Sequence, residues 1–166
     1  IIDHIRKMYG LLIGEKMAEK AKIAIGCAFI DESDPDWVLR SDISGRDLAT
    51  GLPKTIEISS RDICTALEES VKEIIDGIKI TLENAPPELA ADIINTGMVM
   101  AGGGSLLRGL DVLIEKETGI ATMIAENAAE AVAMGTGLSL QNMETIMTHV
   151  RAKNPYANAS SNNNTY

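Results

Sequence analysis

Three consecutive glycines separate a short apolar run from an amphipathic one, a pattern that is typical of a phosphate or nucleotide site. The apolar run covers residues 98–101, and Gly102, Gly103 and Gly104 follow it directly. Glycine lets the backbone approach a ligand closely, and a helix that begins after such a turn offers free amide donors to an anion. The alternative is a tight turn between a strand and a helix, in which glycine only relieves packing.

The spacing of these glycines fits neither of the two common phosphate-binding fingerprints. Leu107 stands where a G-x-G-x-x-G pattern that starts at Gly102 needs its last glycine, which counts against a Rossmann dehydrogenase. The Gly-Lys-Ser/Thr sequence of a P-loop does not follow the turn either. The turn alone therefore leaves both interpretations open.

A second candidate site lies in residues 15–25, which read as a helix that stops at Gly26. Glu19 and Lys22 are three residues apart and so share one face of this helix. A carboxylate and an ammonium group in this arrangement can hold a ribose hydroxyl and the edge of a purine. The alternative is a solvated charged face, which is common for such pairs.

Other residue types that carry chemistry are sparse, so no catalytic residue and no metal site is expected in the chain. His4 and His149 have no cysteine, aspartate or histidine nearby at metal-ligand spacing, and they read as surface residues. No Ser-His-Asp or Cys-His arrangement can be assembled. Cys27 and Cys64 stand alone and read as buried, reduced thiols of a cytoplasmic protein.

Composition narrows the class of protein. The chain has 166 residues, of which 45% are hydrophobic and 3% aromatic, so it can build an aliphatic core. A net charge of -9 argues against nucleic acid as a partner and against a polybasic membrane contact. No apolar run of about 18 residues and no signal peptide is visible, which favours a cytoplasmic location. The chain opens in mid-pattern, so we expect it to start inside a longer protein.

Predicted helices and strands alternate along the chain, and they must position these residues. Ser59 and Asp62 form a capping box ahead of an apolar stripe, which predicts a helix over residues 60–83. Two segments before it, 37–43 and 54–59, have strand composition and are joined by turn-like residues, so a loop is predicted over 44–53. From residue 87 the order is helix, strand, glycine turn, helix, strand and a last helix over 128–148, which implies an α/β fold. Residues 151–166 are polar and low in complexity and are expected to be disordered.

Four stretches in this order resemble the C-terminal half of the MreB family, the bacterial actin-like proteins that organise rod-shaped growth. They are residues 9–26, 44–60, 84–120 and 131–137. The resemblance covers about residues 1–150 and implies domain II of an actin-like ATPase. Residues 1–25 and 60–150 would then form subdomain IIA, an RNase H-like α/β lobe. Residues 26–59 would form subdomain IIB, a small α/β insertion.

The resemblance also implies that the nucleoside of ATP lies between the two candidate sites, with the glycine turn on one side and the helix on the other. Mg²⁺ would accompany the phosphates, with its ligands mostly outside this chain. Both phosphate loops and the catalytic groups belong to the preceding half of the family, so this chain alone is not expected to be an efficient ATPase. The residues that the resemblance places at the nucleotide are Met17, Ala18, Glu19, Lys20, Lys22, Ala101, Gly102, Gly103, Gly104 and Ser105.

The partners that the resemblance implies are other copies of the same protein, in a filament that controls rod shape. Family filaments are associated with the membrane and its cell-elongation machinery. Two alternatives remain open from the sequence. One is another actin-fold ATPase of the chaperone or sugar-kinase type, although no substrate-binding region or sugar-facing acid is visible. The other is a structural fragment that does not bind nucleotide.

Overall fold

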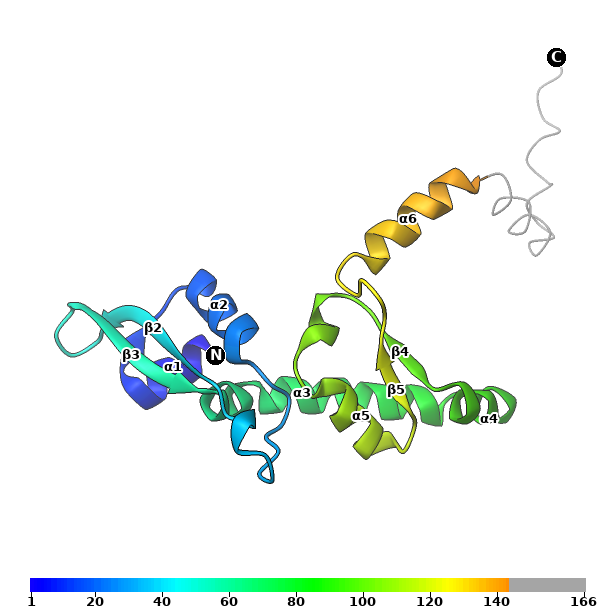
Figure 1. Ribbon diagram of the computed structural model, residues 1–166, viewed down its shortest axis with the longest axis horizontal. Coiled ribbons are helices and arrows are strands. Elements are labelled where there is room, and N and C mark those ends of the chain that lie inside the picture. The colour runs from blue at the N-terminus through cyan, green and yellow to red at the C-terminus, as the bar shows by residue number, and fades with distance from the viewer. Residues whose placement is uncertain (144–166) are drawn as a thin grey trace, which may run out of the picture.

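The computed structural model describes residues 1–143, which form an α/β fold of two lobes on one long helix (Figure 1). This helix, α3 (Ser60–Glu83), runs along the long axis of the view from the first lobe into the second. Two separate cores pack on it. Ile63, near its beginning, belongs to the first core, and Val71 and Ile75 belong to the second.

The start of α3 is fixed by the predicted capping box, and the predicted bounds of this helix are confirmed. The Asp62 carboxylate accepts hydrogen bonds at 2.8 Å from both the backbone N–H and the hydroxyl of Ser59. It also accepts the Tyr9 hydroxyl at 2.6 Å, which ties the preceding lobe to the helix. Burial alone would raise the pKa of Asp62, but the hydrogen bonds from Tyr9 and Ser59 outweigh it and hold that pKa below its ordinary value. The same contact raises the pKa of Tyr9 to about 12.

The first lobe packs two helices on a three-stranded antiparallel sheet of order β1-β2-β3. The two longer strands pair from Arg40 opposite Ser59 to Arg46 opposite Pro53. Its core is closed, since Ile5, Leu11, Ile43 and Ile63 are all at most 1% exposed. The elements of this lobe are α1 (Ile2–Tyr9), β1 (Leu11–Leu12), α2 (Glu15–Ile25), η1 (Pro35–Trp37), β2 (Arg40–Asp47) and β3 (Pro53–Ser59).

Strand β2 is longer than the sequence predicts. The turn-like residues after position 43 predict a loop, but the strand continues to Asp47. The reason is β1, which pairs with the last residues of β2. A Cβ on Gly45 would collide with the backbone carbonyl of Leu12. Glycine is therefore required here for a close approach of two strands rather than for a turn.

The second lobe is built on a two-stranded parallel sheet, in which β4 and β5 pair from Met98 opposite Thr122 to Met100 opposite Ile124. Its core gathers Val71 and Ile75 of α3 with side chains of α5. Two of its helices contain no buried residue, and α6 projects away from the rest of the lobe in Figure 1. The elements are α4 (Pro87–Thr96), β4 (Met98–Met100), η2 (Gly103–Leu106), α5 (Leu110–Thr118), β5 (Thr122–Ile124) and α6 (Ala131–Gln141).

The packing joins α1, β1 and α2 to the β2–β3 hairpin, because all five contribute to the first core. The division into residues 1–25 with 60–150 and residues 26–59 concerns subdomains of the family and stays a prediction. Its boundaries do not coincide with the two cores. The tail 151–166 and the last part of the helix predicted over 128–148 lie outside the described residues.

Candidate functional site

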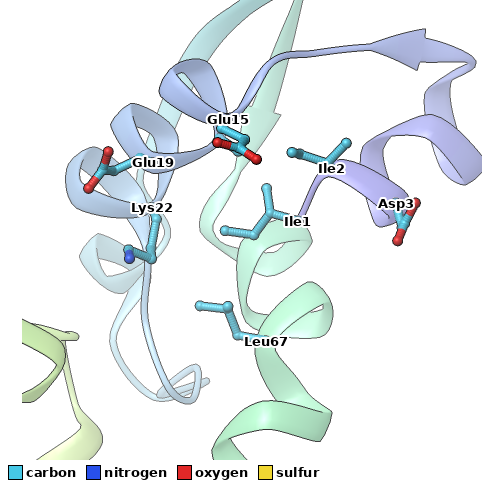
Figure 2. Close-up of a pocket in the computed structure, with 8 residues that line it drawn as sticks. Ile1, Ile2, Asp3, Glu15, Glu19, Lys22 and Leu67 are labelled. Atoms are coloured by element: carbon cyan, nitrogen blue, oxygen red, sulfur yellow. The ribbon is translucent and has the colours of Figure 1, made fainter.

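A cavity of about 430 Å³ lies between α2, the first residues of α1 and α3 (Figure 2). Its volume is in the range that small-molecule sites occupy. The apolar side chains of Ile1 and Leu67 lie beside charged side chains of α2. The cavity therefore suits a ligand with an apolar body and polar edges. The α2 residues that line it follow the i, i+3, i+4, i+7 spacing of one helix face: Glu15, Ala18, Glu19 and Lys22.

Three of the five predicted residues of α2 line this cavity. Ala18 is buried at its wall, and the charged side chains of Glu19 and Lys22 are exposed at the same face. Neither of these two forms an ion pair with any residue in the range 1–143. Met17 instead packs on the first core, and Lys20 is exposed away from the cavity lining.

The cavity also includes residues that the sequence prediction missed. Glu15 lies one helical turn before Glu19 on the same face, so its spacing from Glu19 could have indicated that it lines the cavity. Leu67 comes from α3, and Ile1 with Asp3 from the beginning of the chain. Local spacing cannot indicate these three, because only the packing of the first lobe brings them to α2.

The glycine turn has two kinds of glycine. Gly102 has a φ of +87°, a conformation that other residues rarely adopt. Gly103 and Gly104 have no such φ, and a Cβ added to either would meet no atom within 4 Å. The described part of the chain therefore accounts for glycine at the first position and not at the next two.

The residues on either side of the turn have different surroundings. Ala101 is exposed. Ser105 is buried, and its hydroxyl donates to the carbonyl of Gly102 at 2.7 Å while its N–H donates to the same oxygen at 3.1 Å. Ser105 thus closes the turn from inside, and its contact with a ligand stays a prediction.

The glycine turn does not line the cavity, but its following segment touches the end of α2. A Cβ on Gly26 would lie 3.2 Å from the Cδ1 atom of Leu107. The N–H of Ala28 donates to the carbonyl of Arg108 at 2.9 Å. In Figure 1 α2 and the short turn between β4 and α5 lie on the same side of α3. That the two predicted groups bind one ligand stays a prediction.

The described residues contain no group of three or more His, Cys, Asp or Glu side chains that could hold a metal ion. Cys27 is buried, as predicted, but Cys64 is only half-buried, and the two thiols are not joined in a disulfide. Burial, with the neighbouring Cys27, raises the pKa of the Cys64 thiol to about 11, which makes it a poor nucleophile. His149 lies outside the described range. Within residues 1–143, no helix combines the length and the apolar character needed to cross a membrane.

Comparison with known sequences finds relatives that all belong to one family. Residues 1–148 match the family described as MreB/Mbl protein. The cell shape-determining protein Mbl of Bacillus subtilis is 43% identical over 144 residues, which are 87% of this chain and 42% of that protein. The cell shape-determining protein MreB of Escherichia coli K12 is 42% identical over 87% of this chain and 40% of its own length. The chain thus spans about two fifths of the length of these relatives.

Comparison with solved structures finds a member of the same family. MreB5 of Spiroplasma citri bound to ADP superimposes with a TM-score of 0.80 at 34% identity, over 89% of this chain and 44% of that chain. Its AMPPNP-bound structure gives the same TM-score and identity. The MamK double helical filament matches with a TM-score of 0.60 at 19% identity, over 80% of this chain and 41% of that chain, which supports the actin-like fold alone. The chain therefore has an actin-like fold and belongs to the MreB/Mbl family.

Proposed function

We propose that the chain is the nucleoside-binding half of an actin-like ATPase that polymerises into filaments and controls cell shape. One observation carries the nucleotide part of this proposal. Gly103 and Gly104 are glycines that neither backbone conformation nor packing within the described chain requires. A ligand that lies against the backbone would require them, because any Cβ would occupy its space. The MreB5 structures that this chain resembles are bound to ADP and AMPPNP, which supports a nucleotide as that ligand.

The face of α2 that lines the cavity supplies the complementary groups. The Glu19 carboxylate can accept hydrogen bonds from ribose hydroxyls, and the Lys22 ammonium group can donate to the ring nitrogens of a purine or to a phosphate oxygen. The apolar wall at Ala18 and Leu67 fits the flat face of a base. The nucleoside would then lie against this face of α2 and reach beyond the cavity to the glycine turn, with its phosphates extending from the turn.

The remaining parts of the proposal concern the longer protein that the family implies. Mg²⁺ would neutralise phosphate charge during hydrolysis, and its ligands are proposed to lie mostly outside this chain. Filament assembly would follow nucleotide state, because a nucleotide that binds one conformation better shifts the population toward it. We place these filaments in the cytoplasm, associated with the membrane and the cell-elongation machinery. The family match disfavours a chaperone or a sugar kinase.

The test of nucleotide binding uses this chain preceded by the part of Bacillus subtilis Mbl that lies ahead of its matched region, here called the Mbl chimera. Gly103→Leu places a side chain at the proposed ligand surface. Gly77→Leu is the matched control, since Gly77 is also exposed, has open surroundings and lies on α3 away from the site. Calorimetric titration with ADP should show an affinity at least about ten-fold weaker for Gly103→Leu and unchanged for Gly77→Leu. Equal affinities in both variants would contradict the proposal.

The charged face of α2 is tested separately in the same chimera. Lys22→Met should weaken ADP binding about ten-fold, because one charge-assisted hydrogen bond is lost. Lys16→Met removes the same charge from an exposed position of α2 outside the cavity lining and should leave the affinity unchanged. If both variants bind equally well, Lys22 belongs to a solvated face and not to the site.

A further inference from the structure

The segment directly after the glycine turn is fastened to the first lobe by one arginine. The Nη2 atom of Arg108 donates to the carbonyl oxygen of Trp37 at 2.8 Å and to the hydroxyl of Ser60 at 3.2 Å. The guanidinium carbon lies 5.2 Å from the centre of the Trp37 ring, within the range of a cation–π interaction. The end of η1, the first residue of α3 and the link between η2 and α5 therefore meet at this side chain.

The backbone around Arg108 makes a second set of contacts with the same region. Its carbonyl accepts the N–H of Ala28 at 2.9 Å. Next to it, Gly109 lies so close to Phe29 that a Cβ would stand 2.9 Å from the ring carbon Cε1. The Trp37 indole N–H donates to the carbonyl of Phe29 at 3.0 Å. We call Arg108, its partners Trp37 and Ser60, and Phe29, which contacts Trp37, the arginine latch.

Apart from the buried Ser105, whose hydrogen bonds go to Gly102 within the turn, the glycine turn has little packing of its own. Gly103 and Gly104 are exposed, and Leu106 is 58% exposed. The turn is held mainly at its two ends. At one end the N–H of Gly102 donates to the carbonyl of Ala128 at 2.6 Å. At the other end Arg108 fixes the chain against the first lobe, which also carries α2.

If this contact served stability alone, an arginine would cost more free energy here than an apolar side chain of similar volume. Arg108 is half-buried and pairs with no carboxylate within residues 1–143. Its Nε atom is buried and has no hydrogen-bond partner in the same range. Removing a charged donor from water without a partner costs free energy, and an apolar side chain of similar volume often packs at lower cost. A position that breaks this rule points to a functional requirement.

We propose that Arg108 is a positioning residue for the nucleoside site, because the arginine latch sets the position of the glycine turn relative to α2. The inference rests on the proposed nucleotide binding. Arg108 itself does not contact the nucleotide. It holds the backbone that does, so that Gly103 and the Glu19–Lys22 face of α2 stand at the separation that a nucleoside needs.

The first test measures hydrogen exchange in the 166-residue chain without nucleotide. Arg108→Met keeps an unbranched apolar stem and removes the charge and the donors. Arg46→Met is the control, since Arg46 is exposed on β2 and lies opposite Leu12 and Pro53 rather than opposite a residue of the latch. Amides of residues 102–107 should exchange about ten-fold faster in Arg108→Met, while those of the β2–β3 hairpin keep their parent rates. Unchanged exchange at 102–107, or equally faster exchange throughout both lobes, would overturn the inference.

The second test measures ADP affinity in the Mbl chimera. Arg108→Met should weaken binding about ten-fold, and Arg108→Lys should fall between it and the parent, because an ammonium group reaches one acceptor but lacks the planar fork. Arg46→Met should bind as the parent does. If the parent binds ADP and Arg108→Met binds it equally well, the inference is overturned and the proposed function stands. If the parent does not bind ADP, the proposed function fails first and the positioning role fails with it.

Discussion

The two lobes share α3 but differ in how completely they bury their apolar residues. In the first lobe an antiparallel sheet and two helices enclose Ile5 and Ile43, which are at most 1% exposed. In the second lobe Val99 and Met123 stand 63% and 53% exposed on a sheet of two parallel strands, and Val132 of α6 is 69% exposed. The first lobe therefore has a closed core, while the second presents apolar faces to its surroundings.

This difference follows from the type of sheet. Antiparallel strands can be joined by a hairpin and leave one face to solvent, so β2 and β3 complete their lobe locally. Parallel strands usually have both faces covered, and two of them alone are marginal. We expect the second lobe, which also carries the glycine turn, to gain order from a further part of the longer family protein.

The largest expected effect is a core truncation in the first lobe. Ile43→Ala removes most of a buried side chain and should lower the free energy of unfolding by about 3 kcal/mol. Val99→Ala, on the exposed face of β4, should lower it by less than about 0.5 kcal/mol. Urea denaturation of both variants followed by circular dichroism checks the pair. Equal losses would mean that the second lobe is as closed as the first.

The next effect distinguishes two glycines of the second lobe. Gly109 has a φ of +76° and lies against Phe29, so Gly109→Ala should cost about 2 kcal/mol. Gly103 has open surroundings, so Gly103→Ala should leave stability unchanged or raise it by up to about 1 kcal/mol. Thermal unfolding of the two variants measures the difference. A large loss for Gly103→Ala would assign that glycine to the fold rather than to a ligand.

A smaller effect concerns the Tyr9–Asp62 hydrogen bond between α1 and α3. Tyr9→Phe should lower the free energy of unfolding by about 1 kcal/mol near neutral pH. The folded pKa of Asp62 lies below its unfolded value of 3.8, so its contribution is present above about pH 4 and is lost as the pH falls through the folded pKa. The folded pKa of Tyr9, about 12, lies above 10.0, so its contribution is complete below pH 10 and is lost as the pH rises through 12.

This pH dependence gives the Tyr9→Phe prediction its control. The stability difference between parent and variant should be widest between about pH 5 and 9 and should shrink at both extremes. Urea midpoints measured across the pH range provide the curve. A difference that does not change with pH would show that the Tyr9 hydroxyl does not act through its hydrogen bond to the Asp62 carboxylate.

The smallest effect is expected for the ion pair between Lys79 and Glu117, which links α3 to α5 at 2.7 Å. The hydrogen bond from Lys79 holds the pKa of Glu117 below its ordinary value, but both side chains are well exposed. Water and salt screen such pairs. Lys79→Met should therefore leave the urea midpoint within error of the parent in about 1 M NaCl. A clear loss under these conditions would show that the second lobe depends on this pair.

Short-range sequence patterns predicted the elements whose structure depends on residues within the same segment. The stripe of α3 and the Ser59–Asp62 capping box lie within one segment, and the helix has the predicted bounds. The end of β2 was predicted wrongly, because the role of Gly45 depends on β1, which lies far away in the sequence. Turn-like composition cannot distinguish a loop from a strand that must approach another backbone closely.

The candidate site divides in the same way. The common face of Glu19 and Lys22 follows from their spacing on one helix, and both line the cavity. Leu67 and the partners of Arg108 could not be predicted. Tertiary packing alone brings Leu67 of α3 to the cavity and brings Trp37 and Ser60 to Arg108. The distance between the glycine turn and α2 depends on these contacts and not on any local motif.

The measurement that tests the central claim most directly is calorimetric titration of ADP with Mg²⁺ into the 166-residue chain and into the Mbl chimera. We predict that the chimera binds ADP and that the chain alone binds it at least about ten-fold more weakly, since the phosphates then lack their partners. Absence of binding in both forms would contradict it. Gly103 and Gly104 would then be ordinary residues of an exposed turn, and the cavity beside α2 a solvated surface.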